Sequence, residues 1–262
     1  MTDSIISSDG EFIAYYIDGP RDAPVVMLSN SLGTDARLWE PQLPSLTSHF
    51  RVLRYDSRGH GNSSAPQGDY TLERLGIDAL NLIDALEIEQ VSFAGISLGG
   101  MVGQWLGFHA SDRVRALALC NTSAYIGPPE AWNARIDRVR VHGMPAVADA
   151  VLERWFTGEF LASSSQGVQV ARAMLLATSP VGYAGSCAAI RGMDLRSLGS
   201  RIPVSTLIIA GTYDAATPPA HAEALLAQIP GACLAMLPAA HLSNLEVPQA
   251  FTERLFEFLR QT

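Results

Sequence analysis

A serine flanked by glycines stands between a short apolar run and a stretch with helical spacing. The run covers residues 91–94, and the pentapeptide Gly95-Ile96-Ser97-Leu98-Gly99 follows it. A strand that turns directly into a helix strains its central residue, and glycines on either side allow the close approach. Such a turn presents a hydroxyl at a helix N-terminus, where backbone N–H groups stabilise a developing anion. By itself the motif fits either a nucleophilic Ser97 or an ordinary glycine-rich helix start.

An acid and a base for this serine stand later in the chain. A serine hydroxyl is a poor nucleophile until a base removes its proton and a carboxylate holds that base. Asp214 comes just after the expected strand 204–210, and His241 lies in a loop of small residues after the expected strand 233–237. Both therefore reach the edge of the sheet at which Ser97 lies. The order Ser, Asp, His along the chain is typical of one hydrolase architecture, so we predict Ser97, Asp214 and His241 as a catalytic triad.

Three other side chains compete for the roles of acid and base. His60 is the other histidine with a motif context, and Asp56 and Glu246 are the rival carboxylates. Asp56 and His60 share the turn-rich segment 56–63, in which charges are expected to pin the loop to its neighbours. We therefore expect a structural role for Asp56.

Acyl transfer also needs donors for the tetrahedral oxyanion. The N–H of Leu98, directly after the nucleophile, is one candidate. The second is expected from the loop after the strand 25–29, which reads Asn30-Ser31-Leu32-Gly33-Thr34, and we assign it to the N–H of Leu32. An ordinary turn with a glycine is the alternative interpretation of this loop.

The elements that must position these groups alternate along the chain. Strands buried on both faces appear as continuous apolar runs, and helices as apolar residues at helical spacing. Strands are expected at residues 12–17, 25–29, 51–55, 91–94, 114–120, 204–210 and 233–237. Helices are expected at residues 71–86, 98–109, 219–227 and 248–259. This alternation predicts an α/β fold, with a mostly parallel central sheet flanked by helices.

Residues 121–200 interrupt this alternation. They contain no strand candidate, and helical patterns follow one another at residues 130–141, 146–156, 168–177 and 183–191. Helices inserted between two strands cannot enter the sheet, so they must cover one edge or end of it. We therefore expect a core of residues 1–120 and 201–262, with residues 121–200 as an inserted helical cap, or lid.

Composition excludes several classes of function. With 18 basic and 26 acidic residues, the net charge of −8 disfavours nucleic acid and anionic membranes as partners. All basic residues are arginines, which removes lysine Schiff bases, pyridoxal phosphate attachment and the Walker lysine. The three cysteines form no C-x-x-C pair, so no thiolate metal site is expected. Residues 1–16 show no signal pattern and no apolar run spans a bilayer, which predicts a soluble, cytoplasmic protein.

The chain resembles the α/β-hydrolase superfamily over essentially its full length, and within it the 3-oxoadipate enol-lactonases of bacterial aromatic catabolism. The resemblance rests on residues 28–35 with Trp39, on 56–63, on 95–101 with 103–106, and on 183–191. Many relatives have His-Gly where this chain has Asn30 and Ser31. It implies that Ser97, Asp214 and His241 are the nucleophile, acid and base, without a metal or organic cofactor.

The implied substrate is a small five-membered enol-lactone with a free acetate arm, in the β-ketoadipate pathway. An unpaired buried carboxylate is costly, so the arm must meet a cation, which here would be an arginine. Arg135 stands three residues after Trp132 on an expected helix, so ring and guanidinium share a face. A solvated helix face is the alternative for Arg135, and cap packing is the alternative for Trp155 as a second pocket wall.

Two other functions remain open from sequence. A cofactor-free perhydrolase or haloperoxidase, or another carboxylesterase, uses the same triad. A hydrolase-fold ligand receptor is the non-enzymatic alternative, which the intact triad disfavours. The sequence leaves open whether the chain forms a homo-oligomer.

Overall fold

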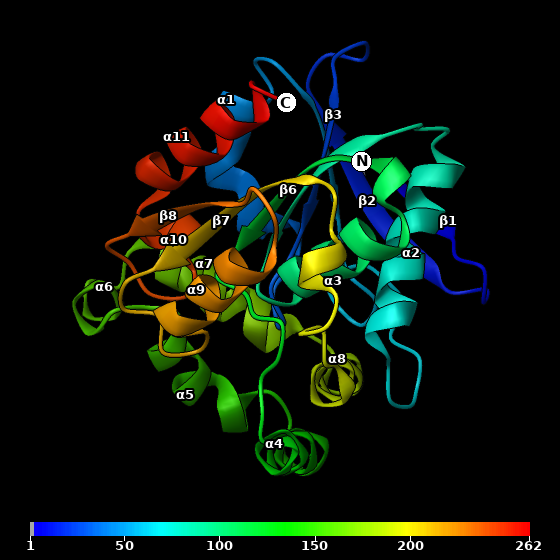
Figure 1. The fold of residues 1–262 in the computed structure, drawn as a ribbon. Coiled ribbons are helices and arrows are strands. Elements are labelled where there is room, and N and C mark those ends of the chain that lie inside the picture. Colours follow the sequence, from blue (N-terminus) through cyan, green and yellow to red (C-terminus); the bar gives the residue numbers. More distant parts are fainter. Residues whose placement is uncertain (1–2) are drawn as a thin grey trace.

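Eight strands form one sheet flanked by helices in the computed structural model, which describes residues 3–262 (Figure 1). The strand order is β1-β2-β4-β3-β5-β6-β7-β8, and every pair from β4 to β8 is parallel. This arrangement confirms the predicted α/β class with a mostly parallel sheet. The strands are β1 (Asp3–Ile6), β2 (Phe12–Asp18), β3 (Val25–Ser29), β4 (Arg51–Tyr55), β5 (Val91–Ile96), β6 (Val114–Cys120), β7 (Ser205–Gly211) and β8 (Cys233–Leu237).

The sequence does not predict β1, which pairs antiparallel with β2 at one edge of the sheet. β2 in turn pairs antiparallel with β4. An edge strand that is mostly exposed needs no apolar run, so the hydrophobic pattern does not indicate this strand. Residues 1 and 2, the start of the segment in which no signal pattern is expected, lie outside the described residues.

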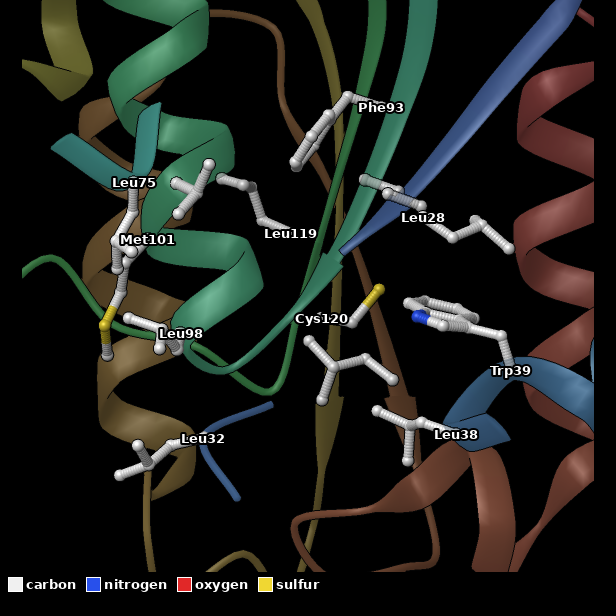
Figure 2. Packing of buried hydrophobic residues seen from close by; sticks show 14 of the residues in the cluster. Leu28, Leu32, Leu38, Trp39, Leu75, Phe93, Leu98, Met101, Leu119 and Cys120 are labelled. Carbon is white, nitrogen blue, oxygen red and sulfur yellow. The ribbon is translucent and has the colours of Figure 1, made fainter. Parts of the chain in front are cut away.

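Helices cover both faces of the sheet. On one face α3 (Leu98–His109) packs against α2 (Leu72–Ala85), and on the other α11 (Pro248–Leu259) packs against α1 (Leu43–Leu46) and the 3-10 helix η1 (Ala36–Gln42). Figure 2 shows Leu98 and Met101 on one side of the strands and Leu38 and Trp39 on the other. Three further short helices and α9 complete the core: η2 (Ser111–Arg113), η3 (Gly199–Arg201), α9 (Pro219–Gln228) and α10 (Ser243–Glu246).

Five helices are inserted between β6 and β7 (Figure 1). They are α4 (Pro129–His142), α5 (Pro145–Trp155), α6 (Gly158–Ala162), α7 (Gln166–Ala177) and α8 (Pro180–Gly192). α8 packs along α4 and also contacts α2, so the insertion is attached to the core. α6 is too short to show helical periodicity and was not expected from sequence. Among residues 3–262 no single helix is long and apolar enough to cross a membrane, although α7 and α8, bent by 97°, pass that criterion as a pair.

Candidate active site

Ser97 lies at the sharp turn between β5 and α3. Its backbone has φ 55° and ψ −113°. This conformation is strained for a non-glycine residue, which adopts it only where the surrounding structure imposes it. A Cβ on Gly95 would lie 2.2 Å from the carbonyl carbon of Gly99, and one on Gly99 would lie 2.3 Å from the Ser29 oxygen. The two glycines therefore allow the strand and the helix to approach closely enough to expose the serine. Ser97 is 7% exposed, and its side chain reaches a cavity.

Asp214 and His241 meet at the carboxyl ends of β7 and β8. His241 Nδ1 lies 2.8 Å from Asp214 Oδ2, and each residue is 3% exposed. The backbone N–H groups of Ala216 and Thr217 donate to Asp214 Oδ1, each at 2.8 Å. Burial by itself would raise the pKa of Asp214, but His241 and the Thr217 N–H hold it at about 2. The carboxylate is therefore charged and aimed at the imidazole.

Two further side chains hold this carboxylate. Thr217 Oγ1 donates to Asp214 Oδ2 at 2.8 Å, and Asn121 Nδ2 donates to the same oxygen at 3.1 Å. Asn121 directly follows β6 and has φ 45°, and its own Oδ1 accepts a 2.6 Å hydrogen bond from Ser243. Sequence reasoning missed Asn121 and Thr217. The position of Asn121 just after a predicted strand is the one signal that pointed to the site edge.

Ser97 and His241 line the same cavity. In the part of the chain that the structure describes, no hydrogen bond joins Ser97 Oγ to His241. Such catalytic contacts are often long before a substrate binds, so the shared cavity is the relevant geometry. Leu32, the expected oxyanion donor, also lines the cavity, and Leu98 is the first residue of α3, whose N–H has no partner within the helix.

The three residues expected to bind substrate, Trp132, Arg135 and Trp155, all line this cavity. The Arg135 guanidinium lies over the Trp132 ring, 5.0 Å from its centroid, as their spacing on α4 indicated. Trp155 is 4% exposed, so it packs within the inserted helices as well as facing the cavity. Tyr183 of α8 adds a hydroxyl group to the cavity lining. Burial raises the pKa of this hydroxyl, and the neighbouring Arg135 counteracts part of the rise.

A second arginine, Arg154 of α5, also lines the cavity, and sequence analysis did not distinguish it from the other arginines of the insertion. Burial and the nearby Arg135 cation lower the pKa of Arg154, although its side chain remains exposed at the cavity mouth. Among residues 3–262, neither Arg135 nor Arg154 forms an ion pair with a carboxylate, and the cavity lining contains no Asp or Glu. An acidic chain thus holds a cationic cavity.

The other arginines of the insertion are used elsewhere. Arg140 and Arg191 both pair with Asp69, at 3.0 and 2.7 Å. Arg172 pairs with Asp149 at 2.8 Å, and Arg138 lies at a separate surface hollow. These four side chains are therefore not positioned for a ligand in the cavity.

The rival carboxylates and histidine lie in structural positions. Asp56 accepts hydrogen bonds from the N–H groups of Ala36 and Asn62, at 2.8 and 2.9 Å, and burial raises its pKa. Glu246 accepts from the Ala240 N–H at 2.9 Å. His60 is buried and contacts the loop that contains Leu32.

No cluster of metal ligands occurs within residues 3–262, where no three His, Cys, Asp or Glu side chains are placed to hold an ion. The groups gathered at the cavity are a serine, a carboxylate-held histidine and two cations.

Comparison with known proteins agrees with this geometry. The model of the alpha/beta hydrolase family matches residues 25–254. The curated 3-oxoadipate enol-lactonase 2 of Acinetobacter baylyi is 40% identical, over 90% of this chain and 89% of that protein. The enol-lactonase structure from Burkholderia xenovorans LB400 is 45% identical with a TM-score of 0.96, covering 98% of this chain and 100% of that one. A hydrolase structure from Pseudomonas aeruginosa PA01 is 50% identical with a TM-score of 0.97, covering 98% of each chain. The chain therefore belongs to the alpha/beta hydrolase family.

Proposed function

We propose that this protein is a serine hydrolase that opens a small enol-lactone bearing a free carboxylate, namely the enol-lactone of 3-oxoadipate. One observation carries the proposal. The cavity that holds Ser97 and His241 is lined by Arg135 and Arg154 and by no carboxylate. Two cations without an ion-pair partner, in a cavity whose lining contains no carboxylate, favour a ligand that supplies negative charge. The similarity to enol-lactonases supports the same substrate class.

In the acylation step, Ser97 Oγ attacks the lactone carbonyl carbon while His241 takes the hydroxyl proton. Asp214, charged and 2.8 Å from His241 Nδ1, stabilises the imidazolium that forms. The ring C–O bond then breaks, and the imidazolium returns its proton to the departing enol oxygen. An enol is a better leaving group than an alkoxide, so less of the barrier depends on this proton transfer. The enol stays attached, because it belongs to the same acyl chain.

In the deacylation step, His241 removes a proton from a water that attacks the acyl-enzyme. The bond from the acyl carbon to Ser97 Oγ breaks, and the serine recovers its proton. The product carries a new carboxylate, and its enol tautomerises to the ketone. We assign stabilisation of both tetrahedral intermediates to the N–H groups of Leu32 and Leu98, which flank the nucleophile from the β3 loop and from α3.

We assign recognition of the substrate carboxylate to Arg135, with Arg154 as a second cation at the cavity mouth. Arg135 is half-buried and held against the Trp132 ring, which restricts where its guanidinium points. A restricted guanidinium loses less conformational freedom when it binds a carboxylate. Trp132 and Trp155 would provide walls for the ring of the substrate.

We also propose that residues 121–200 act as a cap over the site. The inserted helices α4, α5 and α8 contribute Trp132, Arg135, Trp155 and Tyr183 to the cavity, whereas the core contributes Ser97 and His241. The chemistry would therefore belong to residues 1–120 and 201–262, and the substrate preference to the cap.

A matched pair of lactones tests the proposal. The first is the enol-lactone with its free acetate arm, and the second is the methyl ester of that arm, which has the same ring and leaving group. We expect kcat/KM to be at least about tenfold higher for the free acid, since a charge-assisted pair contributes roughly 1.5 to 3 kcal/mol. Equal values for the two lactones would contradict the acidic substrate. If the protein hydrolysed neither lactone and no simple ester, the hydrolase function would be contradicted.

A further inference from the structure

The loop that carries Leu32, residues 30–34, is tied to the core at its first residue. The Asn30 carbonyl oxygen accepts the Gly99 N–H at 3.0 Å, and Asn30 Nδ2 donates to the Tyr55 carbonyl at 2.7 Å. The turn is closed on itself, because the Thr34 N–H donates to the Ser31 carbonyl at 3.1 Å. These bonds leave the middle of the loop, Leu32 and Gly33, to be held by something else.

His60 supplies that hold. The Gly33 N–H donates to His60 Nε2 at 2.9 Å, and His60 Nδ1 lies 3.1 Å from the Arg58 carbonyl. A carbonyl only accepts, so Nδ1 carries the proton and Nε2 is free to accept. His60 is 1% exposed, and burial lowers its pKa, which keeps the ring neutral and Nε2 available. The imidazole therefore bridges the segment 56–63 to the loop of Leu32.

Close packing leaves this loop little room to move. Gly33 has φ +80°, and a Cβ there would lie 2.7 Å from Leu175 and 3.1 Å from Tyr183, both in the inserted helices. The segment that carries His60 is wedged in the same way, since a Cβ on Gly59 would lie 2.5 Å from the Gly182 Cα of α8. Core, loop and insertion thus meet around one imidazole.

We propose that His60 is a positioning residue for the oxyanion hole, which holds the Leu32 N–H at the reacting carbonyl by accepting the neighbouring Gly33 N–H. This role rests on the proposed hydrolase function, because it acts through the Leu32 donor assigned there. His60 itself does not touch the substrate. His60 lies in the turn-rich segment 56–63, and the proposed mechanism assigns it no proton transfer.

Two substitutions separate an acceptor role from simple space-filling. His60→Gln places an amide oxygen near the position of Nε2, whereas His60→Asn places its amide near Nδ1 and leaves the Gly33 N–H without an acceptor. We expect His60→Asn to lower kcat for 4-nitrophenyl acetate by roughly 10- to 100-fold with little change in KM, because an oxyanion donor acts in the transition state. His60→Gln should recover most of that loss. His49→Asn, at an exposed histidine, should have no effect.

An inhibitor comparison reads out the oxyanion hole directly. An alkyl boronic acid forms a tetrahedral adduct with a serine, whereas a linear carboxylic acid does not. His60→Asn should lower the affinity for the boronic acid by about the same factor as it lowers kcat. The affinity for the carboxylic acid should stay unchanged. Unchanged kcat and unchanged boronic acid affinity in a folded His60→Asn protein would overturn the proposal.

A measurement on the unaltered protein covers the case in which His60→Asn does not fold. Nitrogen NMR should show the His60 ring as the Nδ1–H tautomer with an unprotonated Nε2, and the Gly33 amide should exchange slowly. An Nε2–H tautomer or a rapidly exchanging Gly33 amide would overturn the positioning role. These two results do not depend on turnover, so they remain decisive even if the protein hydrolyses none of the esters or lactones.

Discussion

Asn121 Nδ2 donates a 3.1 Å hydrogen bond to Asp214 Oδ2, the same carboxylate oxygen that lies 2.8 Å from His241 Nδ1. The two residues are 93 positions apart in the chain and come from the ends of two neighbouring strands, β6 and β7. Ser243 fixes the Asn121 amide from the other side at 2.6 Å, which orients Nδ2 toward the carboxylate. The direction in which Asp214 faces is therefore set by the sheet as well as by its own loop.

This contact makes the pH profile sensitive to residue 121. Asn121→Asp keeps the size of the side chain and tolerates the positive φ, but it places a second carboxyl beside Asp214. A further negative charge favours the protonated imidazole, so the acid limb of kcat/KM should move to higher pH. Rate profiles of Asn121→Asp and the native protein from about pH 5 to 9 check this. Superimposable profiles would show that residue 121 has no electrostatic effect on the triad.

Removal of the proposed nucleophile gives the simplest prediction. Ser97→Ala should fold normally and lose activity by roughly four orders of magnitude or more, because the hydroxyl contributes to chemistry rather than to the core. Thermal unfolding and steady-state rates on the free-acid lactone measure both parts. Activity within about tenfold of the native protein would rule out covalent catalysis by Ser97.

The two buried carboxylates should respond differently to the same substitution. Asp214→Asn removes the charge that stabilises the imidazolium, so kcat should fall by roughly 10³- to 10⁴-fold. Asp56→Asn replaces the carboxylate that accepts hydrogen bonds from the Ala36 and Asn62 N–H groups. It should therefore lower the midpoint temperature of unfolding but leave most of the activity per folded molecule. Abolished catalysis in a stably folded Asp56→Asn protein, with an active Asp214→Asn protein, would reverse the assignment.

Acid should lower the stability of the native protein through Asp214. The pKa of Asp214 is held at about 2, below the usual value of a free Asp, so the native state is stabilised by the charged form. This contribution is complete above about pH 4 and is lost as the pH falls from about 4 toward 2. Urea unfolding over that range should show the native protein losing stability more steeply than Asp214→Asn. Equal slopes would contradict the low pKa.

The pattern of the core was predictable from sequence because it depends on local spacing. Ser97, Asp214 and His241 were each predicted from a glycine-rich turn or a strand end, and the spacing of Trp132 and Arg135 placed both on one helix face. The edge strand β1 was missed because it is mostly exposed and carries no apolar run.

Other parts of the site depend on contacts that no local pattern contains. Arg154 resembles Arg140 and Arg191 in sequence, and only the fold shows that Asp69 pairs with the latter two and leaves Arg154 at the cavity. The same holds for Asn121, whose amide meets Asp214 across two strands. Long-range contacts therefore decide which of several similar side chains form ion pairs and which line the cavity.

Arg135 provides the sharpest test of substrate recognition. Arg135→Ala removes a cation from the cavity and leaves the substrate carboxylate to be buried without its partner, which costs more than the pair contributes. We expect kcat/KM for the free-acid lactone to fall by about 10- to 100-fold and that for its methyl ester to change by less than about threefold. Arg154→Ala should show the same selectivity at smaller magnitude, because Arg154 is exposed at the mouth and more screened by solvent.

Arg138 is the matched control for this experiment. It lies on α4 three residues after Arg135 but faces a separate surface hollow, so Arg138→Ala should leave both lactones unaffected. Arg191→Ala should act through stability instead, since Arg191 pairs with Asp69 at 2.7 Å. Equal losses on the acid and the ester in Arg135→Ala would mean that Arg135 only holds the Trp132 ring in place. The preference for an acidic substrate would then have to come from Arg154, and the Arg135→Ala, Arg154→Ala double variant would show it as a loss confined to the free acid.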